Sequence, residues 1–188
     1  MAVRFLVFLA AASMLLVRDA SADSWQADPG SRLEVRAERT IERMRVEVAR
    51  SLPYFDNAYA IAVWPGVGRV GFGFGGAYGK GVVIEQGNSV GTVGYWQFSS
   101  GIQAGLKSFA MVVFFRTEEA LDDLKAGKIQ FAGQAGVDVA TVGAHGTPTY
   151  NDGVAIIAMT NFGLMGEFAA TGVKYRYRPY ADTTHGDD

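Results

Sequence analysis

The sequence predicts a single α+β domain, in which an N-terminal amphipathic helix packs on a strongly bent, Gly-rich antiparallel sheet or half-closed barrel with one short inserted helix. Apolar residues recur at helical spacing between residues 31 and 52, and strand-like segments separated by Gly, Asn, Asp and Pro then follow to residue 178. From Gly71 to Gly81, glycine alternates with aromatic residues and no helix follows. Such alternation is typical of a curved sheet, where glycine lets the backbone bend or approach a neighbour closely.

The N-terminal helix is expected to begin at Ser31, which can cap it together with Glu34, and to end at Pro53. Its polar face carries arginines and four glutamates, so the simpler interpretation is a solvated helix laid on the sheet. The alternative is a helix on a membrane surface, which the arginines favour and the glutamates oppose. The apolar face consists of Leu33, Ala37, Ile41, Met44, Val48 and Leu52.

The rest of the chain is expected to be sheet, interrupted by one short helix at 117–125 with Thr117 as its N-cap and Gly127 just past its end. A break is expected at Trp64-Pro65-Gly66. The predicted strands or strand pairs are 58–64, 67–78, 81–86, 91–98, 101–115, 129–143, 154–160, 163–170 and 173–178.

Composition limits the class of protein. A chain of 188 residues is long enough for one well-buried domain and too short for two of ordinary size. It has no Cys, which excludes disulfides and thiolate metal sites, and a formal net charge of −2 gives no support for nucleic-acid binding.

We expect a signal peptide at 1–22, a flexible lead-in at 23–30, the single domain at 31–180 and a disordered tail at 181–188.

Four segments stand out along the chain when taken in order. They are the apolar strand Ala60-Ile61-Ala62-Val63-Trp64-Pro65, the glycine-rich run from Gly71 to Gly81, the element Gly101-Ile102-Gln103-Ala104-Gly105, and the run from Gly133 to Ala140 with Asp138 alone among small residues. Through these segments the chain resembles the SYLF domain family of lipid-binding modules over roughly residues 52–180. Each segment alone is a weak match, and their order and spacing carry the resemblance.

The resemblance implies non-catalytic binding of anionic phospholipid, with phosphoinositide-like head groups in eukaryotic members, some of which also bind actin. For an exported chain without an SH3 or FYVE domain, we expect an anionic phospholipid membrane as the partner and do not expect actin. The chain departs from the family at Phe162, where a basic residue usually precedes the Gly-Leu-Phe turn. One expected contributor to a cationic lipid patch is therefore missing.

The sequence shows no set of residues suited to catalysis. Gly71-x-Gly73-x-x-Gly76 matches a dinucleotide fingerprint, but a Gly-broken strand rather than a helix follows, so we interpret Gly73, Gly75 and Gly76 as structural. The only histidines are His145 and His185, and Asp138 is better explained as a buried acceptor of backbone N–H groups. We therefore expect no enzyme activity, no cofactor and no metal.

The candidate binding residues are cationic. Period 2 along a strand places Lys174, Arg176 and Arg178 on one face, with Tyr175 and Tyr177 on the other. One interpretation is an edge strand that basic side chains protect from aggregation, and the other is a comb of cations for lipid head groups. Further cations that flank the glycine-rich strands and could extend the comb are Arg69, Lys80, Lys107 and Arg116.

Three classes of function remain. Lipid binding without catalysis is favoured. A small outer-membrane β-barrel protein is the alternative, since Gly and aromatic alternation suits one, although the Arg/Glu helix, the helix at 117–125 and the polar C-terminal end count against it. An enzyme ranks third, for want of a nucleophile and base or a metal site.

The first prediction concerns export. Arg4 precedes the apolar run 5–17, and Ala20-Ser21-Ala22 fits a signal peptidase. The run is shorter than the roughly 20 residues that a helix needs to cross a bilayer. We expect a Sec-exported protein, periplasmic or secreted and peripheral at a membrane, whose mature chain begins at Asp23. N-terminal sequencing of the protein from its native host checks this, and a mature chain that retains Met1 or Ala2 contradicts it.

Overall fold

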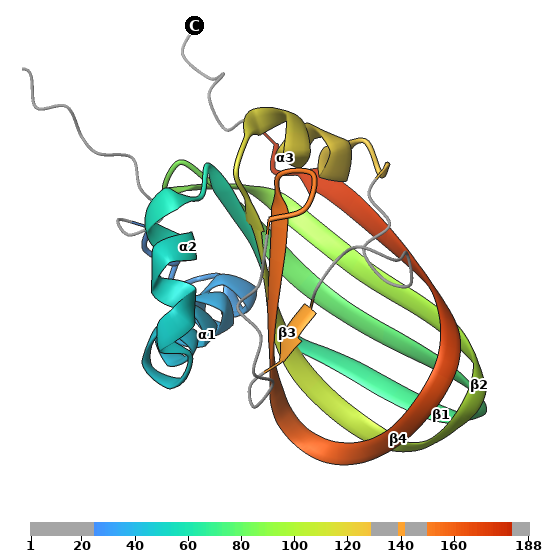
Figure 1. Ribbon diagram of the computed structural model, residues 1–188. Helices are drawn as coiled ribbons and strands as arrows, with labels where there is room; N and C mark the ends of the chain where they lie inside the picture. The colour runs from blue at the N-terminus through green and yellow to red at the C-terminus, as the bar shows by residue number, and fades with distance from the viewer. Residues whose placement is uncertain (1–24, 129–138, 142–149, 182–188) are drawn as a thin grey trace, which may run out of the picture.

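The computed structural model describes the backbone of residues 25–128, 139–141 and 150–181, with the side chains of this part except those of 101–103, 139–141 and 162–172. Its helices and strands follow one another as shown in Figure 1. In chain order they are α1 (Arg32–Glu47), the 3-10 turn η2 (Ala49–Ser51), α2 (Leu52–Asn57), β1 (Ala60–Glu85), β2 (Asn88–Phe115), α3 (Glu118–Lys125), β3 (Val139–Thr141) and β4 (Val154–Pro179).

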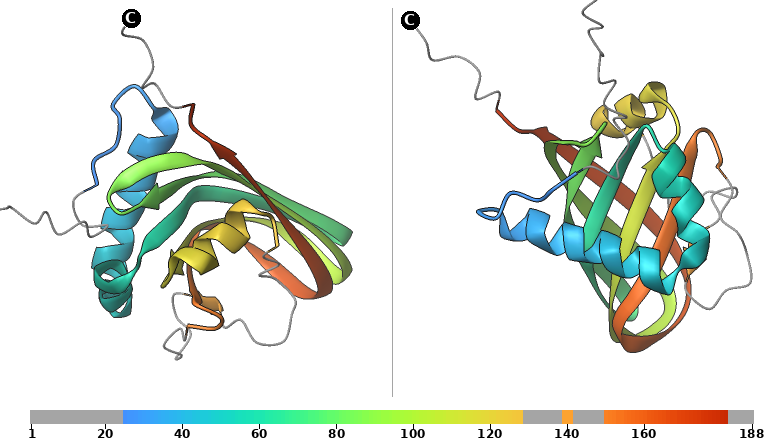
Figure 2. Two further views of the ribbon diagram at one scale, coloured as in Figure 1. Left: turned by 90° about the horizontal axis from the view of Figure 1, so that it is seen from above. Right: turned by 90° about the vertical axis from the view of Figure 1, so that its left-hand side faces the viewer.

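The strands form one four-stranded sheet in the order β1-β2-β4-β3. The long strands β1, β2 and β4 pair antiparallel along nearly their whole length, and the sheet is open and strongly bent (Figures 1 and 2). The α+β class with an antiparallel sheet is thereby confirmed. The short β3 is an exception, because it pairs parallel to β4. Of the strand predicted at 129–143, the described residues include only β3.

Each long strand continues through glycine and proline positions where we expected strands to end. β1 alone spans most of the predicted strands 58–64, 67–78 and 81–86. Its pairing register shifts between Trp64 and Val67 and again between Phe72 and Phe74, so bulges bend the strand without ending it. The expected break at Trp64-Pro65-Gly66 is therefore wrong, and these residues form a bulge within β1.

β1 bends so far that its two halves lie against each other. A Cβ added at Gly81 would lie 2.6 Å from the carbonyl oxygen of Val63, and one at Gly79 would lie 2.8 Å from the side chain of Val67. Side chains do not fit at such distances, so the contact between the two halves requires glycine at both positions. Gly73 has a left-handed φ of 71°, which also favours glycine.

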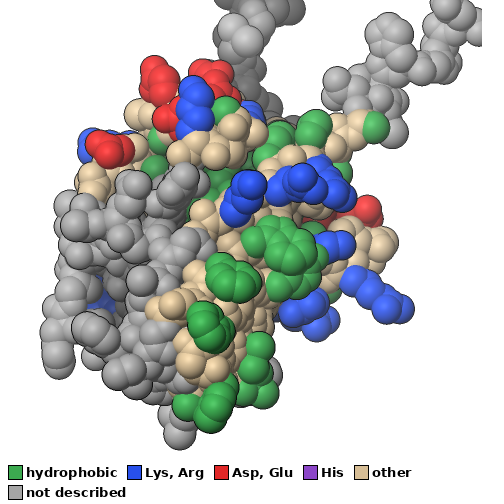
Figure 3. All heavy atoms as spheres, turned by 90° about the vertical axis from the view of Figure 1, so that its right-hand side faces the viewer, with side chains coloured by type: hydrophobic (Ala, Val, Ile, Leu, Met, Phe, Trp, Pro, Cys, Tyr) green, Lys and Arg blue, Asp and Glu red, His purple; other side chains and the backbone are tan. Residues whose placement is uncertain are grey.

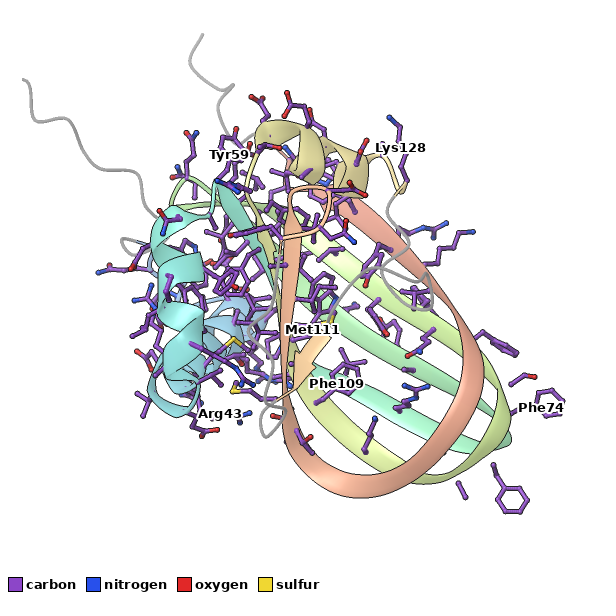
Figure 4. All side chains as sticks on the ribbon, in the orientation of Figure 1. Arg43, Tyr59, Phe74, Phe109, Met111 and Lys128 are labelled. Atoms are coloured by element: carbon purple, nitrogen blue, oxygen red, sulfur yellow. The ribbon has the colours of Figure 1, made fainter. Side chains whose placement is uncertain are left out.

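The two faces of the bent sheet are buried by different helices. We call the concave face, where Phe109 and Met111 point, the inner face, and the face that α1 covers the outer face (Figure 4). On the inner face Leu121 and Leu124 of α3 belong to a buried cluster that also contains Trp64 and Val113. The outer cluster combines Ala37, Ile41, Met44 and Val48 from the helical segment with Phe55, Ile61, Val63, Val82, Ile84, Ala110, Val112 and Phe114.

α1 begins as expected, because the Ser31 side chain accepts a hydrogen bond from the Glu34 backbone N–H at 3.3 Å. The helix ends at Glu47, before Pro53, which lies instead in the first turn of α2. The expectation that Pro53 ends the helix is wrong because proline is well tolerated in a first turn, where its missing N–H would have no helical partner. Leu52, assigned to the apolar face, is exposed at the start of α2.

The segment before α1 is packed rather than flexible over residues 25–30. The Trp25 side chain is buried, and its indole N–H donates to Ser89 Oγ at 2.9 Å. The backbone N–H of Asp28 donates to Glu34 Oε2 at 3.0 Å. Residues 23–24, the predicted signal peptide and all of the predicted tail except Ala181 lie outside the described residues.

The inserted helix matches the expectation. α3 follows Thr117, whose side chain accepts from the Ala120 N–H at 3.4 Å, and Gly127 after the helix has a left-handed φ of 69°.

The second prediction concerns the contact between the halves of β1. We expect Gly81→Ala to lower the free energy of unfolding by about 1–3 kcal/mol, since the added methyl group overlaps the Val63 carbonyl and the Trp64 ring. Gly68→Ala is the matched control, because a Cβ at Gly68 meets nothing within 4 Å. Urea denaturation of both variants measures the difference. Equal stability of the two would contradict the close approach.

Candidate functional site

The three predicted cations of β4 share the exposed outer face. Lys174, Arg176 and Arg178 are exposed. In contrast, Val173, just before Lys174, and Tyr175, between Lys174 and Arg176, are buried on the inner face. Tyr177 also points away from the cations, and its hydroxyl donates to the carbonyl of Val90 at 2.9 Å. The period-2 arrangement predicted for this strand is confirmed.

Strand pairing brings a fourth predicted cation beside them. Gly94 of β2 pairs with Lys80 of β1 on one side and with Arg176 of β4 on the other. Lys80 is also exposed, so Lys80 and Arg176 lie on the same face with one glycine between them. We call the set Lys80, Lys174, Arg176 and Arg178 the cationic cluster.

A groove of about 310 Å³ is lined by three members of the cationic cluster, Lys80, Arg176 and Arg178. Gly94 has no side chain to fill the space between Lys80 and Arg176, which leaves the groove open there. Leu33 of α1 lines it as well, so the helix bounds the groove. A neighbouring hollow of about 300 Å³ is lined by Trp96, Lys174, Tyr175 and Arg176. Figure 3 shows basic side chains gathered on this face above a group of apolar ones.

The positive charge of the cluster is not neutralised by a neighbour within the described part of the chain. The ion pairs found there join other residues, such as Lys125 with Glu85 at 3.0 Å and Lys128 with Asp123 at 3.3 Å. Neither these nor the other ion pairs of the described residues involve a member of the cluster. The cluster is therefore a local positive patch on a chain whose formal net charge is −2.

Arg69 and Lys107 do not join the cluster. They pair directly across β1 and β2, but on the inner face, where Arg69 is only 8% exposed. Burial lowers the pKa of both side chains, and the charge of Arg69 lowers that of Lys107 further. The expectation that they extend the comb is therefore wrong.

Arg116 is also separate. It follows the end of β2, next to α3, and its guanidinium lies over the ring of Tyr150, 5.7 Å from the ring centroid. It does not line either hollow at the cationic cluster.

The arginines of α1 are divided between two environments. Arg43 donates to Asn161 Oδ1 at 2.7 Å and pairs with Glu47 at 3.6 Å, and Arg45 lies over the ring of Phe55 at 4.8 Å. These side chains have structural contacts within the fold. The exposed arginines of the helix are Arg32, Arg36 and Arg39. They form a second cationic surface, whose part in binding an anionic ligand has to be compared with that of the cationic cluster.

The sequence reasoning missed the aromatic residues that adjoin the cluster. The rings of Tyr78 and Trp96 lie 4.5 Å apart between centroids, and both residues line the groove with Lys80. The alternation of glycine with aromatic residues was the available indication, because only one of the two sets can face the crowded interior. Gly79 and Gly81 take buried inner positions, and the residues that alternate with them, Tyr78 among them, point to solvent.

In the described ranges no group of three or more His, Asp or Glu side chains is placed to hold a metal ion. Asp138, His145 and His185 lie outside the described residues. No helix described here is both long and apolar enough to cross a bilayer.

Comparison with known proteins adds no family assignment. No protein-family model matches the chain. A search of curated proteins likewise gives no significant match.

The third prediction concerns the inner face. Tyr95 donates its hydroxyl to Gln97 Oε1 at 2.9 Å, and burial raises its pKa from 10.0 to about 12. In the unfolded chain the pKa of tyrosine is the ordinary 10.0. The contribution of the raised pKa to the free energy of unfolding is therefore fully present below about pH 10 and is lost as the pH rises toward 12. We expect Tyr95→Phe to flatten the fall in unfolding free energy over this range. Urea denaturation from pH 9 to 12 tests this, with Tyr78→Phe on the exposed face as the control, and an unchanged slope in Tyr95→Phe contradicts it.

Proposed function

We propose that this protein is a non-catalytic module that binds anionic phospholipid head groups at a membrane surface through the cationic cluster. The observation that carries the proposal is the gathering of Lys80, Lys174, Arg176 and Arg178 on one exposed sheet face, around a groove and without an acidic partner among the described residues. Charge of one sign concentrated beside a groove favours a ligand of the opposite sign.

The spacing of the cations suits a surface of phosphates. Alternate residues of a strand lie about 7 Å apart, so the cations of β4 form a row. Lys80 lies across β2 from this row, at about twice the strand separation of 4.8 Å. A phosphate in the groove would therefore meet cations from both sides, with the Gly94 backbone beneath it. Each cation close to an anionic bilayer contributes about 1 kcal/mol.

The resemblance to SYLF domains supports the same proposal. The basic residue that the family usually carries before its Gly-Leu-Phe turn is replaced here by Phe162. In this chain the cations of β4, with Lys80, are proposed to supply that charge. With the export pattern at the N-terminus, the proposal places the protein at a periplasmic or extracellular membrane surface, where actin is not its expected partner.

The fourth prediction tests the cluster. Replacing Lys174, Arg176 and Arg178 together by Gln should reduce affinity for anionic vesicles by roughly two decades, at about 1 kcal/mol for each charge. Binding by the wild type should also weaken between 0.1 M and 1 M salt, because the Debye length falls from about 10 Å to about 3 Å. Vesicle co-sedimentation with phosphatidylcholine alone and with 30% phosphatidylserine measures both effects. The melting temperature should stay near that of the wild type, since the three side chains are exposed.

The matched control removes three charges from α1 through Arg32, Arg36 and Arg39 replaced by Gln. These side chains are also exposed, so the two variants differ in which surface loses charge and not in net charge. The proposal expects the helix variant to bind nearly as well as the wild type. A loss confined to the helix variant would move the site to α1, and absence of wild-type binding to any anionic vesicle would refute lipid binding itself.

A further inference from the structure

A surface of large apolar side chains continues from the cationic cluster toward the bent end of the sheet. Phe72, Phe74 and Phe98 are 89%, 72% and 74% exposed, which is far outside the usual environment of phenylalanine. Figure 4 shows Phe74 pointing away from the body of the molecule at the far end of β1 and β2. The remaining members of this apolar surface are Val70, Tyr78, Trp96 and Leu106, each more than 40% exposed.

Strand pairing places Phe74, Phe98, Tyr78 and Trp96 on one continuous surface. Phe74 pairs with Ser100, and the next outer-face position along the two strands brings Gly76 opposite Phe98. Two positions further, Tyr78 pairs with Trp96, and the next pair contains Lys80. The outer face therefore changes along the strands from the level of Lys80 and Arg176, through the Tyr/Trp pair beside Lys174, to phenylalanines. Figure 3 shows basic side chains grouped above apolar ones on this face.

A continuous exposed apolar surface of this kind marks an interaction site. Three features favour a bilayer as its occupant over another protein. Cations border the apolar surface on the side of the groove, where they would meet anionic head groups. A tyrosine and a tryptophan lie at the boundary, and these residues prefer the interface between head groups and acyl chains. Only beyond them do the phenylalanines follow, so the polarity of the protein falls in the same order as that of a leaflet.

We propose that the bent end of the sheet inserts into the outer part of one leaflet, with Phe72, Phe74 and Phe98 among the acyl chains. This inference rests on the proposed function and adds the mode of binding to it. Tyr78 and Trp96 then lie at the interface, and the cationic cluster contacts the head groups. The dimensions agree, because Phe74 lies four residues from Tyr78 along β1, or about 13 Å, within one leaflet of a hydrocarbon core about 30 Å thick.

Insertion predicts two properties that surface charge alone does not give. Charge recruits the protein, and burial of the phenylalanines then retains it, so binding to anionic vesicles should persist in part at 1 M salt. Trp96 should also enter a less polar environment. Trp25 and Trp64 are buried in the fold, at 9% and 0% exposure, whereas Trp96 is 54% exposed, so a change in tryptophan emission on binding reports Trp96.

The fifth prediction uses Phe72, Phe74 and Phe98 replaced together by Ser. The control is Val46 and Leu52 replaced by Ser, since these are exposed apolar residues of the helical segment, away from the apolar surface. Vesicles with 30% phosphatidylserine are used at 0.1 M and 1 M salt, with and without spin-labelled lipids that quench tryptophan. We expect the phenylalanine variant to lose roughly a thousandfold or more in affinity, because three large apolar side chains no longer leave water for the acyl chains. The control should bind as the wild type does, and spin-labelled lipid should quench Trp96 in the wild type and in the control but not in the phenylalanine variant.

The outcomes separate this inference from the proposed function. If the wild type binds no anionic vesicle, both fail. If the wild type binds, but the phenylalanine variant binds equally well and Trp96 is not quenched, insertion is refuted and charge-based binding stands. If sedimentation velocity shows a wild-type dimer that the phenylalanine variant abolishes while its vesicle binding is unchanged, the apolar surface joins two copies and insertion is again refuted. Thermal unfolding checks each variant, and Phe74→Ser alone replaces the triple variant if that variant does not fold.

Discussion

The close contact between the two halves of β1 is the constraint on which the rest of the structure depends. Gly79 and Gly81 lie so near Val63 and Val67 that no side chain fits there. Because side chains alternate along a strand, glycine on the inner positions sends the residues between them to the outer face. The exposed positions of Tyr78 and Lys80 follow directly from the glycines beside them. The crowded interior and the chemically distinct outer surface are two results of one sequence alternation.

The helices then decide how much of the outer face remains free. α1 covers the part that contains Ile61, Val63, Val82 and Ile84, and these side chains are fully buried. Lys80 is the next outer-face residue along β1 beyond this cover, and it is exposed. The helix therefore bounds the cationic groove and leaves the bent end of the sheet uncovered. The part of the outer face that α1 covers is a packed support, and the uncovered part next to it is the surface available for interaction.

Local physical chemistry made parts of the fold predictable. Ser31 and Thr117 both accept hydrogen bonds from the first turns that follow them, so the starts of α1 and α3 could be located from single residues. The ends of the strands were harder to predict from the sequence, because Gly and Pro permit a bulge within a strand as well as a turn that ends it. Pro53 shows the same ambiguity in a helix, since proline both stops one helix and begins another. These residues limit the backbone, and their surroundings select among the remaining conformations.

The sequence by itself determined that Lys174, Arg176 and Arg178 share a face, because period 2 within one strand requires no partner. Only the tertiary structure decided that Lys80 joins them, since this depends on the register across β2. It also decided the place of Arg69. Val63 and Arg69 would share a face in a regular strand, but the bulge between Trp64 and Val67 reverses the alternation and turns Arg69 inward. A bulge depends on pairing with a neighbouring strand, and no local pattern in the chain specifies that pairing.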